Sequence, residues 1–217
     1  MLRIVAHFFS FVFHPLLMMT YMLVLLLLVN PYLFGVNNVA DSDLLILLVF
    51  LSTFMIPAFS VAMMRFLGLI DSFQMESKQE RIGPYIATGI FYLWMFRNLY
   101  SNPDIPVAFK IFTLGATIAL FIAFFINLFS KISIHAVGMG GLLAMIIITT
   151  ILFSYGSFII SSLGLQVSMM ALIMLAIIFT GIVCTSRLIL NAHNLQDIYG
   201  GLVVGFGAQF IALQILL

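Results

Sequence analysis

Hydrophobic residues form long runs along this 217-residue chain, and short polar stretches separate the runs. An apolar run of about 17–25 residues is long enough to cross the hydrocarbon core of a bilayer as a helix. The polar and turn residues between the runs predict seven spans: 15–29, 44–67, 85–99, 107–129, one from about 136, 167–185, and one from about 198 to the end. If one short segment is re-entrant, the number of spans falls to six.

Proline and polar residues mark where these spans bend or end. The first span ends at Asn30-Pro31, and Pro57 predicts a kink inside the second. Residues 71–84 are the most polar stretch of the chain, so we expect a loop or an interfacial helix there. The boundary between the fifth and sixth spans, around residues 154–164, is poorly marked.

The composition is that of a polytopic membrane protein. Hydrophobic residues make up 64% of the chain, charged residues make up 7%, and the mean hydropathy is +1.27. Backbone groups inside a bilayer must be hydrogen-bonded within their own segment, which favours helices, and the long unbroken runs are unlike the short alternating strands of a barrel. We therefore predict an all-α transmembrane helical bundle that forms one integral membrane domain over residues 1–217.

Charge and cysteine content argue against several other classes of protein. A net charge of +1 without a basic cluster gives no electrostatic reason to expect a nucleic-acid partner. The single cysteine, Cys184, cannot form an intramolecular disulfide. No group of Asp and Glu residues has the spacing of metal ligands, so we expect no metal and no cofactor.

Three polar segments follow the second, fourth and sixth predicted spans. In an alternating topology they all open on the same face of the membrane, so residues far apart in sequence can meet in one site. The segments contain Lys78 and Arg81, then His135, then Arg187, His193 and Asp197.

The last of these segments carries the strongest chemical signal. Charged residues inside membrane segments are costly, so Arg187, His193 and Asp197 are candidates for function. The i, i+4 spacing predicts that His193 and Asp197 lie on one helix face, where a carboxylate can orient an imidazole. Cations beside such a pair suit a tetrahedral oxyanion, because a guanidinium can bind two phosphate oxygens and a histidine can attack phosphorus or carry a proton.

These residues resemble the motifs of the type 2 phosphatidic acid phosphatase superfamily of membrane phosphatases. The family's third motif, Ser-Arg-x5-His-x3-Asp, is matched in full by Ser186, Arg187, His193 and Asp197. The region that resembles the family covers about residues 78–205.

The other two motifs are matched in part. Of the second motif, Pro-Ser-Gly-His, this chain keeps Ser133 and His135. Of the first, Lys-x6-Arg-Pro, it keeps Lys78, Arg81 and Pro84 at a compressed spacing.

The resemblance implies a role for each matched residue. His193 would be the nucleophile that forms a phosphohistidine, Asp197 would orient it, and His135 would protonate the leaving group. The phosphate would be bound by Arg187, Lys78 and Arg81, aided by Ser133. Whether Lys78 or Arg81 is the main ligand from the first motif stays open.

The implied function is that of a metal-independent integral membrane phosphatase acting on a lipid phosphomonoester or an isoprenoid diphosphate. Two alternatives stay open. A lipid phosphotransferase would use the same residues with an acceptor other than water, and a membrane carrier would use the buried charges as a proton relay. The sequence leaves the lipid and the oligomeric state undetermined.

Two features of the sequence bear on which side of the membrane the site faces, and they disagree. With the site residues set aside, Arg3, Arg65 and Lys131 lie on the motif face, and Arg97 and Lys110 lie on the other, which favours a cytoplasmic site by the positive-inside rule. The resemblance implies a bacterial inner-membrane protein whose site faces outward. We expect the outward orientation.

One residue pair and one motif have simpler interpretations. His7 and His14, seven residues apart, are expected at the membrane interface rather than as metal ligands. Gly201-x3-Gly205 permits close helix contact and is interpreted as internal packing rather than a dimer interface.

Overall fold

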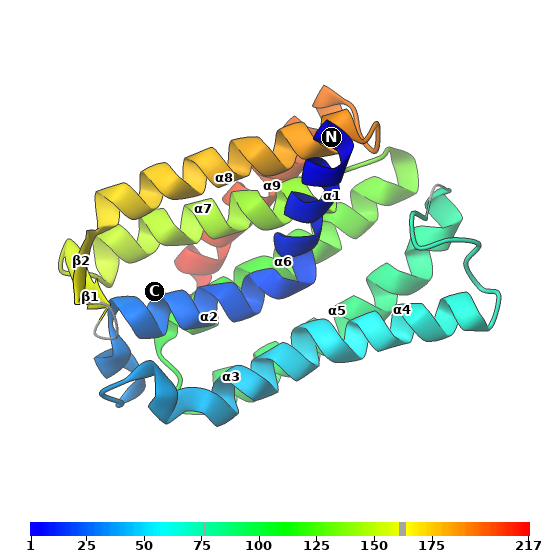
Figure 1. Ribbon diagram of the computed structural model, residues 1–217. Coiled ribbons are helices and arrows are strands. Elements are labelled where there is room, and N and C mark those ends of the chain that lie inside the picture. The colour runs from blue at the N-terminus through cyan, green and yellow to red at the C-terminus, as the bar shows by residue number, and fades with distance from the viewer. Residues whose placement is uncertain (76, 161–163) are drawn as a thin grey trace.

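The computed structural model describes residues 1–75, 77–160 and 164–217 as a bundle of long helices with one short hairpin (Figure 1). The α-helices are α1 (Leu2–Val12), α2 (Met18–Val29), α3 (Asp43–Phe50), α4 (Ile56–Phe66), α5 (Lys78–Ser101), α6 (Val107–Phe129), α7 (Ile134–Leu152), α8 (Met169–Ile189) and α9 (Leu195–Leu216). The 3-10 turns are η1 (Pro15–Leu17), η2 (Pro31–Phe34) and η3 (Val39–Ser42), and η4 (Leu51–Met55) is a π-helical turn.

Six helical segments within the described residues are long and apolar enough to cross a membrane. They are Leu2–Val29, Pro31–Phe66, Val107–Phe129, Ile134–Leu152, Met169–Ile189 and Leu195–Leu216. A chain with this many apolar helices is a membrane-embedded protein. The predicted polytopic helical architecture is confirmed at that level.

The second predicted span is irregular near Pro57, as expected. The irregularity is the π-helical turn η4, which immediately precedes α4, and Pro57 occupies the first turn of α4. Proline lacks an N–H and its ring crowds the carbonyl four residues earlier, so the helix widens locally there.

The third predicted span begins earlier than its hydrophobicity indicates. Ser77 caps α5 and forms a capping box with Glu80, so residues 78–84 are the first turns of the same helix rather than a separate loop or interfacial segment. Polar capping side chains stabilise a helix start that hydropathy alone does not detect. α5 is the one predicted span outside the six apolar segments.

The poorly marked boundary contains a feature that the all-α prediction missed. Strands β1 (Ser157–Ile160) and β2 (Leu165–Ser168) pair antiparallel, with Ser157 opposite Ser168. Gly156 and Gly164 flank β1 and β2 with positive φ angles, which glycine adopts without strain. Residues 161–163 of the predicted boundary lie outside the described residues.

The closest helix packing joins α7 and α9, two parallel neighbours in the bundle (Figure 1). A Cβ built on Gly205 would lie 1.9 Å from the carbonyl oxygen of Val137, and one built on Gly201 would lie 2.7 Å from that of Ser133. The interpretation of Gly201-x3-Gly205 as internal packing is therefore confirmed. This contact brings the starts of α7 and α9 together, where several candidate site residues lie.

Candidate functional site

A cavity of about 440 Å³ lies at the end of the bundle where α5, α7 and α9 begin and α8 ends. Residues from the α1–η1 junction, α4, the 73–75 segment, α5, α6, α7 and α8 contribute to its wall. The titratable side chains in the wall are His14, Arg81, Tyr85, His135 and Arg187. The cavity thus collects cations and imidazoles inside a largely apolar bundle.

His193 and Asp197 form a hydrogen-bonded pair that is not part of the cavity wall, and His193 is close enough to Arg187 and His135 in that wall to interact with them electrostatically. His193 Nδ1 lies 3.3 Å from Asp197 Oδ2, and both side chains are about nine-tenths buried. The same carboxylate oxygen accepts the backbone N–H of Asn194 at 3.2 Å. Because a carboxylate accepts, His193 Nδ1 carries the proton and Nε2 keeps a free lone pair, which is the tautomer a nucleophile needs.

The pair does not lie on one helix face, contrary to the i, i+4 prediction. His193 precedes α9, Asn194 is the N-cap, and Asp197 is in the first turn. The Asn194 side chain accepts the Asp197 N–H at 2.8 Å, so the capping box turns the chain and brings the two side chains together. The predicted contact exists, but a helix cap produces it.

Burial and the nearby guanidinium of Arg187 lower the pKa of His193 from 6.5 to about 4. The hydrogen bond with Asp197 opposes this shift, because it stabilises the imidazolium. His193 is therefore neutral at pH 7, the form in which Nε2 can attack an electrophile.

His135 is held by the N-terminal helix rather than by a carboxylate. Its Nε2 lies 3.0 Å from the backbone oxygen of Ser10, 125 residues earlier in the chain. A carbonyl only accepts, so Nε2–H donates and Nδ1 is left to gain or lose a proton. A histidine oriented in this way can act as a general acid or base.

Arg187 is bound on one side and unsatisfied on the other. Its Nη1 donates to Ser10 Oγ at 3.4 Å. Its Nε is buried and has no hydrogen-bond partner among the described residues, and the same holds for the hydroxyl of Tyr85. An unpaired buried polar group costs about 1–3 kcal/mol, so both donors favour an acceptor in the cavity.

The two candidate cations of the first motif occupy different places. Lys78 is exposed and its Nζ donates to the backbone oxygen of Phe129, and it is not part of the cavity wall. Arg81 lines the cavity, and its Nη1 donates to Asn127 Oδ1 at 3.0 Å. The structure therefore brings Arg81, and not Lys78, to Arg187 and His135.

Ser133 is fully buried and serves local structure. Its Oγ caps α7 by accepting the N–H of Ala136 at 3.4 Å, and its own N–H donates to the backbone oxygen of Asp197 at 3.1 Å. The second contact fixes the start of α7 against the start of α9. Ser133 is not in the cavity wall. It lies where the start of α7 meets the start of α9.

Sequence reasoning missed Ser10, and it predicted His14 at the membrane interface, whereas the structure places His14 in the cavity wall. Arg3, His7 and Ser10 follow one another at spacings of four and three residues, which places polar groups along one face of α1, and His14 comes four residues later, just after that helix ends. That face runs from exposed residues to the buried Ser10, and α1 packs against α8. The spacing is visible in the sequence, but only the fold shows which residues these side chains contact.

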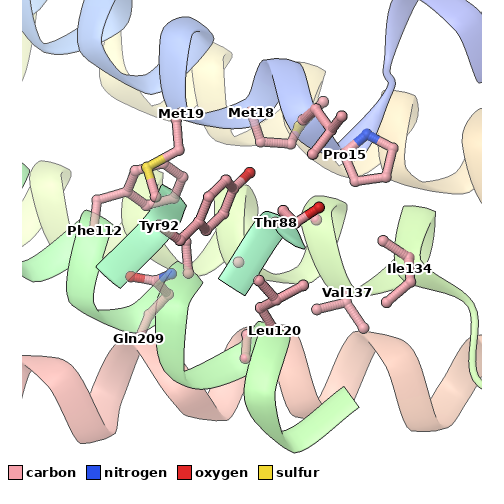
Figure 2. Close-up of a pocket in the computed structure, with 15 residues that line it drawn as sticks. Pro15, Met18, Met19, Thr88, Tyr92, Phe112, Leu120, Ile134, Val137 and Gln209 are labelled. Atoms are coloured by element: carbon pink, nitrogen blue, oxygen red, sulfur yellow. The ribbon is translucent and has the colours of Figure 1, made fainter. Parts of the chain in front are cut away.

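A smaller cavity of about 60 Å³ continues from the first toward the interior of the bundle. The two cavities share Pro15, Leu16, Thr88, Leu120 and Ile134. Figure 2 shows Pro15, Thr88 and Ile134 toward one end and Tyr92, Phe112 and Gln209 toward the other. Its wall is mainly apolar, which suits a hydrocarbon segment better than a charged group.

In the part of the chain that the structure describes, no three His, Cys, Asp or Glu side chains lie close enough to hold a metal ion.

Comparison with known proteins gave no match: no family model, no curated protein and no solved structure resembles this chain significantly. The functional argument therefore rests on the residues and geometry described above.

Proposed function

We propose that this protein is an integral membrane lipid-phosphate phosphatase that acts through a phosphohistidine, as the resemblance of its motifs implies. The observation that carries the proposal is the placement of the neutral His193–Asp197 pair near Arg187 and His135, in whose cavity Arg187 Nε and the Tyr85 hydroxyl have no acceptor among the described residues. A phosphate group presents only acceptor oxygens and negative charge, so it satisfies such a cavity.

In the first chemical step the Nε2 lone pair of His193 attacks phosphorus, and the bond from phosphorus to the lipid oxygen breaks. His135, protonated at Nδ1, gives that proton to the leaving oxygen. The Ser10 carbonyl accepts Nε2–H throughout and stabilises the imidazolium. Asp197 does the same for His193, which becomes positively charged as it forms the phosphohistidine.

In the second step water attacks the phosphohistidine. Neutral His135 takes a proton from the water, the bond between phosphorus and His193 Nε2 breaks, and phosphate leaves. Both histidines return to their starting states, and no other reactant is needed.

Arg187 and Arg81 would hold the phosphate oxygens. Arg187, whose Nε has no hydrogen-bond partner among the described residues, and Arg81 both line the cavity. Phosphoryl transfer depends mainly on positioning and charge stabilisation, which two guanidinium groups supply. We assign Arg81 as the ligand from the first motif and Lys78 to a peripheral place.

The substrate would be an amphiphile, with its phosphate in the charged cavity and part of its tail in the apolar continuation or the bilayer. Phosphatidic acid, phosphatidylglycerol phosphate, a lipid A phosphate and an isoprenoid diphosphate all meet this description. We place the protein in a bacterial inner membrane with the site facing outward. Hydrolysis of a membrane-impermeant phosphate ester by intact spheroplasts tests the orientation, because a cytoplasmic site would require lysis.

The deciding experiment is phosphate release by the detergent-purified protein from a panel of lipid phosphates, with EDTA present. We expect release by the wild type and by the His7→Ala control, and none by His193→Ala. Release that needs an added alcohol acceptor would establish a phosphotransferase instead. No release from any lipid by folded protein, together with transport that survives His193→Gln, would favour the carrier.

A further inference from the structure

His14 occupies a place in the cavity that no part of the matched motifs accounts for. It follows α1 and is the N-cap of η1, where its Nδ1 accepts the N–H of Leu16 at 3.4 Å. An acceptor nitrogen carries no proton, so the proton of the neutral ring is on Nε2. The cap therefore fixes both the position of the ring and its tautomer.

The surroundings of His14 are those of the proposed phosphate site. Its ring meets that of His135 edge-on, with centroids 5.7 Å apart and an interplanar angle of 81°. On another side it meets Phe54, with centroids 6.3 Å apart. Arg187 is close enough to His14 for the two groups to interact electrostatically, and both line the cavity.

Three donors on residues that line this cavity have no acceptor within the described residues. They are the Nε–H of Arg187, the hydroxyl of Tyr85 and the Nε2–H of His14, whose only hydrogen bond is through Nδ1. Arginine cannot accept, and His14 cannot accept at Nε2 while Nδ1 receives the Leu16 N–H. A ligand rich in acceptors satisfies all three donors together.

We propose that His14 is a substrate-binding residue whose Nε2–H donates to an oxygen of the phosphate held by Arg187. The neutral ring binds the oxyanion without adding a charge that would compete with protonation of His135. The proposal rests on the proposed function for the identity of the ligand, since the shared chemistry is that of a tetrahedral oxyanion. It extends the site to the N-terminal helix, which already contacts Arg187 and His135 through Ser10.

Two amide substitutions separate this binding role from the capping role. In His14→Gln the amide nitrogen reaches the former position of Nε2 and keeps a donor for the ligand. In His14→Asn the amide oxygen reaches the former position of Nδ1, so the cap on Leu16 is kept and the donor is lost. His14→Leu removes both, and His7→Leu is the matched control on the exposed part of α1.

The experiment measures the dissociation constant of orthovanadate, a phosphate analogue, and KM and kcat for a lipid phosphate with each purified variant. We expect His14→Leu and His14→Asn to weaken orthovanadate binding and to raise KM about tenfold, as the loss of one charge-assisted hydrogen bond predicts. His14→Gln and His7→Leu should stay within about twofold of the wild type.

Each outcome bears on the inference separately from the proposed function. If the wild type hydrolyses lipid phosphates and His14→Asn binds orthovanadate normally, His14 has no binding role while the phosphatase stands. If His14→Gln is as weak as His14→Asn in folded protein, the effect is structural and the inference fails. If no lipid is hydrolysed but orthovanadate binding depends on His14 as described, the inference stands and the phosphatase does not.

Discussion

The contact between α7 and α9 and the region beside α4 are built in opposite ways. Along the α7–α9 contact, backbone meets backbone: Cβ atoms on Gly140 and Gly205 would lie 2.5 and 1.9 Å from carbonyl oxygens of the facing helix. On α4, Phe59 and Phe66 are exposed, while Ala58 and Val61 line the larger cavity. Figure 1 shows α3 and α4 along one edge of the bundle, with α7 and α8 along the other.

The difference explains how a helical bundle can contain both a precise site and space for a ligand. The close contact fixes the start of α7 relative to the start of α9, and Ser133 N–H bonds directly to the Asp197 carbonyl there. α4 packs mainly against α5 and η4, so its residues border the cavity without filling it. Precise positioning follows from small residues, and volume follows from sparse packing.

The largest expected effect is on His193 and Asp197, the proposed catalytic pair that the α7–α9 contact positions. In Asp197→Asn the amide oxygen can take the place of Oδ2, which receives both His193 Nδ1–H and the Asn194 N–H, but the negative charge that stabilises the His193 imidazolium is lost. Hydrolysis should fall roughly 10³–10⁴-fold with little change in folding. Phosphate-release kinetics measure the loss, with Asp104→Asn in the 102–106 turn as the control; a loss below tenfold would contradict the assigned role.

The next effect is on the close contact itself. Gly205→Ala places a methyl group against the Val137 carbonyl, and backbone on both sides prevents an easy adjustment. We expect a loss of about 3 kcal/mol in the free energy of unfolding, since such overpacking strains both helices. Gly207→Ala is the matched control because open space surrounds that position. Equal thermal unfolding of the two variants in detergent would show that the helices separate freely.

A smaller effect concerns the protonation of His193. Its pKa of about 4 in the folded protein lies below its ordinary value of 6.5, so the unfolded chain binds more protons between these pH values. The stability associated with neutral His193 is complete above pH 6.5 and is lost as the pH falls through about 4.

Urea unfolding at pH 7 and pH 5 tests this assignment. The wild type should lose more stability than His193→Gln over that interval. Ring-proton NMR, assigned with the same variant, should show His193 still mostly neutral at pH 5, where a histidine of ordinary pKa is roughly 97% charged. A titration midpoint near 6.5 would show that the site is open to water.

The smallest effect is expected on the α4 side. Val61→Phe enlarges a side chain of the cavity wall that can extend into the open cavity. The free energy of unfolding should therefore change by less than about 0.5 kcal/mol. KM for a lipid phosphate should rise a few-fold because the added ring takes space from the ligand. Ala62→Phe, on the exposed face of the same helix, is the control. If Val61→Phe lost as much stability as Gly205→Ala, the α4 side would be as closely packed as the α7–α9 contact, and the two regions would not differ.

Much of the fold was predictable because its determinants are local. The hydrophobic run at residues 107–129 has the same bounds as α6, and Asn30-Pro31 ends the first span as expected. The start of α5 was not predictable from hydropathy, since a capping box rather than apolar residues begins the helix. The β1–β2 hairpin was missed because its strands are four residues each and lie between two long apolar runs.

The sequence by itself determined which end of the bundle holds the candidate site. With all seven predicted spans crossing the bilayer, alternation places Arg81, His135 and Arg187 at one membrane face, because each span carries the chain to the other side before it turns.

Only the tertiary structure decided which groups meet at that end. It placed Arg81 rather than Lys78 in the cavity wall, bonded Ser10 to both His135 and Arg187, and brought His14 into the same wall. These contacts join α1 to α7 and α8 across more than a hundred residues. They depend on helix angles and close approaches that no local pattern specifies.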